Sequence, residues 1–87
     1  MPKVYLSETD KLNDGFVRAY NARTAFQKLR NYEIAAKTGI ALRTLYNRLD
    51  DPSGLRVHEL RAIARVAGMS RDEIADFILG KGVDTNA

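Results

Sequence analysis

The sequence contains no cysteine and a single histidine, His58. Without cysteine, neither disulfide bonds nor thiolate metal sites can form, so folding depends on packing alone. One histidine also excludes the usual clusters that bind metals or act as general bases. We therefore expect no cofactor and no enzymatic activity, and we interpret His58 as an exposed helix residue.

Long apolar runs are also missing from the sequence. No stretch approaches the ~20 apolar residues that a membrane span requires, and the first twelve residues lack the profile of a signal peptide. With 87 residues, 45% of them hydrophobic and 29% charged, the composition is that of one globular domain. These features predict a cytoplasmic protein with no membrane association.

Positive charge is concentrated in one part of the chain, although the net charge is only +3. The segment 16–48 carries seven basic residues against one acid, whereas the part from Asp51 onward carries five basic residues against six acids. A run of charge is commonly just a solvated face. On a segment that also carries a recognition motif, it indicates a surface that faces phosphates.

Five segments have the apolar periodicity and the end signals of α-helices. The expected helices span about residues 8–29, 32–38, 42–49, 57–67 and 71–79. They predict an all-α, five-helix domain over residues 7–80, with an N-terminal arm at residues 1–6 and a loose tail at residues 81–87. The residues expected to share one core are Ala35, Ile40, Leu45, Leu60 and Ile74.

The first helix is expected to be capped by Ser7 and to be weakened, or broken, at Gly15. Its expected apolar face consists of Leu12, Phe16, Ala19, Phe26 and Leu29. Asn31 is the expected cap of the second helix. Ser70 and Glu73 have the spacing of a capping box at the start of the fifth helix, which is the strongest local signal in the sequence.

Residues 31–49 have the pattern of two short helices joined by a three-residue turn. Helices that cross so closely require a small residue at the crossing, which Ala35 supplies. They also require a residue that tolerates positive φ four positions later, which Gly39 supplies. Ile34, Ile40 and Leu45 can then close an apolar cluster beneath the crossing. These offsets predict a helix-turn-helix unit.

With these features the sequence resembles the Cro/repressor (XRE-type) helix-turn-helix family of phage and bacterial regulators. The resemblance covers about residues 16–78, and the segment 44–49, followed by Asp51-Pro52 and Glu59-Leu60-Arg61, is similar to phage-associated members. It implies a compact, lambda-repressor-like fold and a transcriptional regulator that binds double-stranded DNA sequence-specifically, in the cytoplasm of a bacterial or phage-infected cell. Unlike many members, the chain has Ala41 at the position that would cap the recognition helix, about residues 41–49.

The resemblance places the base-reading positions of the family on this recognition helix, and the positions are Ala41, Leu42, Arg43, Tyr46 and Asn47. The spacing agrees, because Leu45 and Leu49 would face the core and leave the polar positions outward, toward a major groove. Arg43 can form two hydrogen bonds with a guanine edge, and Asn47 can do the same with adenine.

Several of these residues have an alternative role. Leu42 can contact a thymine methyl group or be partly buried against a neighbouring helix. Tyr46 can contact DNA or pack on the flank of the first helix. Contacts with the DNA backbone are expected from a second set of residues, although each of them can equally be a solvated surface residue. This set consists of Arg30, Asn31, Lys37, Thr44, Arg48 and Arg56.

Double-stranded DNA is therefore the expected partner, and no small-molecule ligand is indicated. A homodimer is expected on functional grounds, because one helix on one half-site binds weakly. The alternative is a protein-interaction module, such as an antirepressor or assembly factor, that keeps the helix-turn-helix scaffold without binding DNA. The near-neutral C-terminal half and Leu42 fit this alternative, whereas the basic segment 16–48 favours DNA.

Overall fold

The computed structural model describes residues 8–80, and over this range the chain forms five α-helices, one short 3-10 helix and no strand. The elements are α1 (Glu8–Gln27), α2 (Asn31–Thr38), α3 (Leu42–Asp50), η1 (Pro52–Gly54, the 3-10 helix), α4 (Val57–Ala67) and α5 (Arg71–Leu79). The predicted all-α, five-helix domain is therefore confirmed. The predicted arm at residues 1–6, the Ser7 cap and the tail at residues 81–87 lie outside the described residues. None of the described helices is long and apolar enough to cross a membrane.

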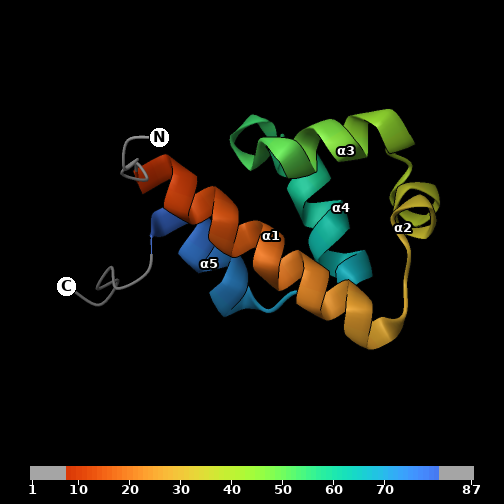
Figure 1. Cartoon of the computed structure of the whole chain (residues 1–87), viewed down its shortest axis with the longest axis horizontal. Helices are drawn as coiled ribbons and strands as arrows, with labels where there is room; N and C mark the ends of the chain where they lie inside the picture. Colours follow the sequence, from red (N-terminus) through yellow and green to blue (C-terminus); the bar gives the residue numbers. More distant parts are fainter. Residues whose placement is uncertain (1–7, 81–87) are drawn as a thin grey trace, which may run out of the picture.

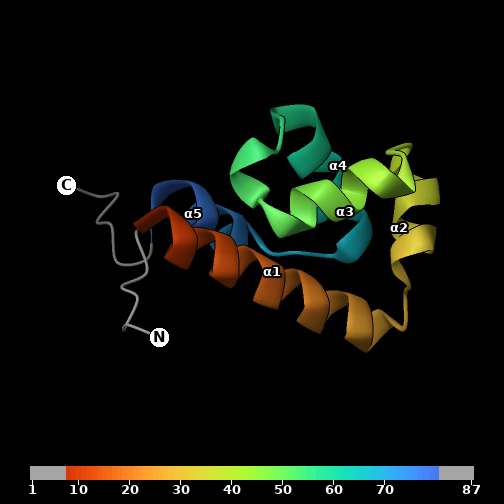
Figure 2. The same cartoon turned by 45° about the horizontal axis from the view of Figure 1, so that its top comes forward.

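The long helix α1 runs along one side of the molecule, and α2 follows beyond its C-terminal end (Figure 1). Helix α5 packs along α1, α4 packs on both α1 and α2, and α3 packs on α2. The chain turns back at η1 to pass from α3 to α4 (Figure 2). Because η1 contacts both α1 and α3, it closes the corner between these two helices.

The core is formed by side chains from α1, α2, α3 and α4. Its buried members are Phe16, Tyr20, Ile34, Ala35, Leu45, Leu60, Ile63 and Ala67. Of the five residues predicted for the core, Ala35, Leu45 and Leu60 are buried, whereas Ile40 and Ile74 are partly buried and pack against this cluster. The predicted core is thus correct in location, and two of its members lie at its edge.

The buried face of α1 agrees in part with the predicted one, since Phe16 is buried and Leu12, Ala19 and Leu29 are half-buried. Phe16, Tyr20 and Thr24 are buried along it at a spacing of four residues, and the Thr24 hydroxyl donates to the Tyr20 carbonyl at 2.9 Å. Phe26, which was predicted to lie on this face, is 88% exposed. At 3.6 residues per turn it stands about 240° around the helix from Tyr20. The helix also continues through Gly15 without a break and ends two residues before the predicted end.

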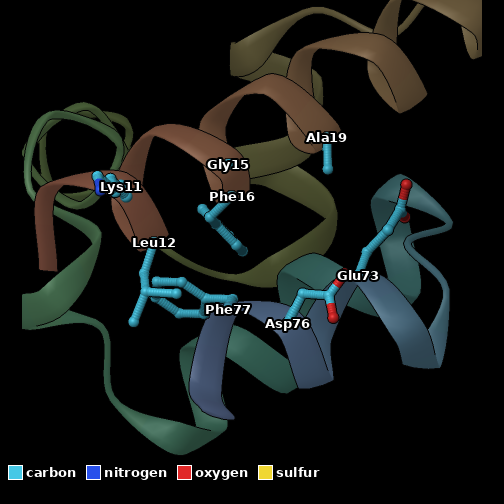
Figure 3. A pocket seen from close by; sticks show the side chains of 8 residues that line it. All are labelled: Lys11, Leu12, Gly15, Phe16, Ala19, Glu73, Asp76 and Phe77. Carbon is cyan, nitrogen blue, oxygen red and sulfur yellow. The ribbon is translucent and has the colours of Figure 1, made fainter. Parts of the chain in front are cut away.

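Helices α1 and α5 meet through the rings of Phe16 and Phe77, whose centroids lie 4.6 Å apart (Figure 3). A hollow of about 240 Å³ lies beside these rings. Arg23 Nε donates to the two carboxylate oxygens of Glu73 at 3.0 and 3.2 Å. Glu73 also accepts from the Ser70 N–H at 2.9 Å, while the Ser70 hydroxyl accepts from the Glu73 N–H at 3.1 Å. The predicted capping box is therefore confirmed.

Candidate nucleic-acid interface

Helices α2 and α3 are joined by the three residues 39–41, as the sequence predicted. Gly39 has a φ of 78°, and its N–H donates to the Ala35 carbonyl at 2.9 Å, which ends α2. A Cβ atom at Gly39 would have nothing within 4 Å, so glycine is required by the backbone conformation and not by lack of space. Ala35 is buried, as a close crossing of the two helices requires.

The Thr38 side chain links the end of α2 to this turn. Its hydroxyl donates to the Ile34 carbonyl at 2.8 Å and accepts from the Ile40 N–H at 3.3 Å. A bulky apolar side chain at this position could form neither bond. Thr38 therefore stabilises the turn with hydrogen bonds that the sequence alone did not predict.

The start of α2 differs from the prediction, because Arg30 and not Asn31 is its N-cap residue. The Glu33 carboxylate accepts from the Arg30 N–H at 2.8 Å. Asn31 is the first residue of the helix, and its Oδ1 accepts from the Tyr20 hydroxyl at 2.9 Å. Burial, followed by the nearby Tyr46, raises the pKa of Tyr20 to about 12. Tyr20 therefore remains a donor at neutral pH and fixes α2 to α1.

One face of α3 is held against the rest of the protein. Leu45 is fully buried, and Leu49 is partly buried against the core, as predicted. Ala41 is the N-cap residue of α3 and provides no side-chain hydrogen bond. Its carbonyl accepts from the Leu45 N–H at 2.9 Å. The position of α3 therefore depends on packing and on contacts nearer its C-terminal end.

The opposite face of α3 is open. All five positions that the resemblance assigns to base reading are exposed, and they are Ala41, Leu42, Arg43, Tyr46 and Asn47. The Arg43 and Asn47 side chains form no hydrogen bond or ion pair within residues 8–80. Tyr46 is about half exposed and lies close enough to Tyr20 to raise its pKa. Tyr46 thus has a neighbour on α1 and still presents half of its surface outward.

The six residues predicted to contact phosphates fall into two groups. Arg30, Lys37 and Arg56 are exposed, and their side chains form no ion pair in the described part of the chain. The other three, which are Asn31, Thr44 and Arg48, are half-buried. The side-chain oxygen of Asn31, Oδ1, already accepts a hydrogen bond from the Tyr20 hydroxyl within the protein.

Arg48 connects α3 to α4. Its Nε donates to Oε1 of Glu59 at 2.9 Å, and the two side chains are only 25% and 8% exposed. The same oxygen accepts from the Arg56 N–H at 2.9 Å. Burial opposes the ionisation of Glu59, but the Arg56 hydrogen bond and the Arg48 guanidinium outweigh it and lower the pKa of Glu59. Glu59 is therefore a carboxylate at neutral pH, and it holds the C-terminal half of α3 against α4.

The seven basic residues of the segment 16–48 also fall into two groups, those that pair with a carboxylate and those that do not. Arg18 pairs with Asp14 at 2.9 Å, Arg23 pairs with Glu73, and Arg48 pairs with Glu59. The remaining four are exposed and have no ion pair among residues 8–80, and they are Lys28, Arg30, Lys37 and Arg43. They lie just after α1, next to or within α2, and on α3. The free positive charge of this segment is therefore concentrated in and beside the helix-turn-helix unit.

No group of three or more His, Asp or Glu side chains in residues 8–80 is placed to hold a metal ion. No match was found when the chain was compared with models of known protein families, with curated proteins and with solved structures. The resemblance of residues 16–78 to the Cro/repressor family remains a prediction from the sequence.

Proposed function

We propose that this protein is a transcriptional regulator that binds double-stranded DNA sequence-specifically, with α3 as its recognition helix. One observation carries the proposal. Arg43, Tyr46 and Asn47 lie exposed along a helix whose other face is fixed by Leu45 in the core and by Arg48 on α4. Arginine and asparagine are the side chains that form paired hydrogen bonds with guanine and adenine in the major groove. A helix of nine residues suits that groove.

The distribution of unpaired charge supports the same proposal. Arg30 and Lys37 lie at the two ends of α2, the helix that precedes the recognition helix. In helix-turn-helix proteins the first helix of the unit crosses the DNA backbone, where cations contact phosphates and fix the register. Arg56, which is exposed just before α4, is a further candidate for such a contact.

Asn31 and Arg48 were expected from the sequence to contact phosphates, and we propose a different role for them. Asn31 Oδ1 accepts from the Tyr20 hydroxyl, and Arg48 Nε donates to Glu59, within the protein. We assign them as positioning residues that fix α2 on α1 and α3 on α4. A recognition helix held in this way loses little conformational freedom on binding, which favours affinity and discrimination between sites.

The experiment that tests the proposal is selection of preferred sites from a pool of random DNA duplexes. The selected site and a scrambled duplex are then titrated with the full chain at several salt concentrations. We expect one enriched sequence, and binding that weakens as salt rises, because contacts with phosphates release counterions. An inverted repeat in that sequence would show that two copies bind together. Failure to enrich any sequence, or binding unaffected by salt, would contradict the proposal and favour the protein-interaction alternative.

A further inference from the structure

An apolar groove of about 700 Å³ runs between α4 and α5. Val57, Ile78 and Leu79 line it and are 71%, 58% and 52% exposed. The buried Leu60 and the half-buried Ile74 lie among the other lining residues, so the groove is continuous with the core. Contiguous apolar surface of this kind on a small domain is typical of an interaction site.

The charged residues that line this groove are all basic. They are Arg61, Arg65 and Arg71, and no acidic side chain lines the groove. All three are exposed, and none pairs with a carboxylate among the described residues. Two of the three α5 carboxylates, those of Glu73 and Asp76, lie instead at the hollow between α1 and α5 (Figure 3). The groove therefore combines an apolar surface with three arginines that no carboxylate of residues 8–80 pairs with.

We propose that this groove binds an acidic amphipathic α-helix of a partner protein. Such a helix would place apolar side chains at positions i, i+3 or i+4 and i+7 on the apolar surface. Its glutamate or aspartate residues on either side would meet the three arginines. The eleven residues of α4 extend over about 16 Å, so the groove fits a helix of about three turns. This inference is independent of the proposed binding of DNA.

A second copy of this protein, docked through the same α4–α5 face, is a less suitable occupant of the groove. An isologous contact repeats the same residues on both sides of a two-fold axis. It would therefore bring the arginine set of one copy toward that of the other, with no carboxylate in the groove to compensate. Like charges placed together across an interface are costly. An acidic helix instead neutralises the three arginines and covers the exposed apolar side chains.

The first test is a selection from a displayed library of helix-forming peptides of about four turns. Their apolar face is fixed, and their flanking positions vary freely among glutamate, lysine and serine. With the full chain as the target, we expect glutamate to be enriched at the flanking positions. Absence of enrichment, or enrichment of lysine, would overturn the proposal.

Charge reversal tests whether the selected peptide binds in this groove. The change Arg61→Glu with Arg65→Glu is expected to weaken the peptide at least about tenfold, and a peptide with lysine in place of glutamate is expected to recover binding to this variant. Ile78→Asp is expected to abolish binding of both peptides, and thermal unfolding checks that the variants are folded. Lys11→Glu with Arg18→Glu, two exposed positions on α1, is the matched control and is expected to bind the acidic peptide normally. Peptide affinity that is unchanged in the charge-reversed variant would overturn the proposal.

Two other occupants are tested with the same variants. Light scattering over a range of protein concentrations measures self-association, and sedimentation with phosphatidylglycerol vesicles measures membrane binding. We expect neither to depend on Ile78. A dimer, or vesicle binding, that is lost on Ile78→Asp would show that the groove is occupied by a second copy or by a lipid surface, and would overturn the assignment to an acidic helix.

Discussion

Arg48 and Glu59 form an ion pair across the loop between α3 and α4, with 2.9 Å between Nε and Oε1. The carboxylate is almost fully buried and also accepts from the Arg56 N–H at the start of α4. Oε1 of Glu59 thus links the Arg48 side chain on α3 to the backbone at the start of α4. The pair lies at the C-terminal half of α3, whereas Leu45 fixes its middle.

Replacement of Arg48 by alanine is expected to destabilise the protein by about 2–3 kcal/mol. Breaking a buried ion pair costs about 3–5 kcal/mol, because the remaining charge has no partner. The partial exposure of Arg48 and the remaining Arg56 hydrogen bond reduce this cost. Urea unfolding measures the change in the free energy of unfolding. Arg43→Ala, an exposed position on the same helix, is the control and should change it by less than about 0.5 kcal/mol. Equal stability of the two variants would contradict a structural role for the pair.

The buried carboxylate of Glu59 and the half-buried carboxylate of Glu73 also predict how stability depends on pH. Burial opposes ionisation of Glu59 and Glu73, but hydrogen bonds and the charges of their arginine partners outweigh it, so the pKa of each is lowered. A lowered pKa in the folded state gives stability that is fully present above the ordinary glutamate pKa of about 4.3. This stability is lost as the pH falls through the lower pKa of the folded protein.

We therefore expect the free energy of unfolding to decrease as the pH falls through about 4.3, where the glutamates of the unfolded chain are half protonated. Urea unfolding at a series of pH values measures it. In a variant with Glu59→Gln and Glu73→Gln the decrease should be smaller, because neither residue can then take up a proton. An identical pH dependence in the parent and this double variant would contradict the prediction.

The turn between α2 and α3 allows a test of backbone conformation without a change in packing. Gly39 has positive φ and open space where a Cβ atom would lie. Gly39→Val is expected to cost about 1–2 kcal/mol, because β-branched residues disfavour positive φ. Gly39→Asn should cost less, because asparagine tolerates this region best after glycine. Thermal unfolding compares the two variants. A valine variant as stable as the asparagine variant would mean that the turn does not need this conformation.

Local signals were sufficient to predict most of the fold. The Ser70–Glu73 capping box, and Gly39 at the end of α2, depend on residues close together in the chain, and both are present as predicted. Apolar periodicity placed Leu45 on the buried face of α3. These features follow from the chemistry of a single helix or turn, so they can be recognised in the sequence alone.

The contacts that position the candidate interface could not be predicted in the same way. The Tyr20–Asn31 and Arg48–Glu59 pairs are each eleven residues apart and join different helices. No periodicity within one helix indicates such a pair. Phe26 shows the same limit, since it fits an apolar pattern and yet lies on a side of α1 that no other described helix covers. The pattern gives the apolar positions, and only the packing of the helices decides which of them are buried.

The proposed function requires that base reading and phosphate binding be separable by mutation. Arg43 and Asn47 are exposed on α3, and Lys37 is exposed in the last turn of α2. Arg43→Ala and Asn47→Ala are each expected to weaken binding to the selected duplex by about 1–3 kcal/mol and to relax the preference at particular base pairs. Titrations of the selected and scrambled duplexes measure both effects.

Lys37→Ala is expected to act differently, because a phosphate is the same at every base pair whereas a groove edge is not. It should weaken the selected and scrambled duplexes alike, and it should reduce the dependence of binding on salt by about one phosphate contact. Arg18→Ala, which removes an exposed cation paired with Asp14 on α1, is the matched control for loss of charge and should change the salt dependence less. If Arg43→Ala left both affinity and site preference unchanged, α3 would not be the recognition helix, and a protein-docking role for this unit would be favoured instead.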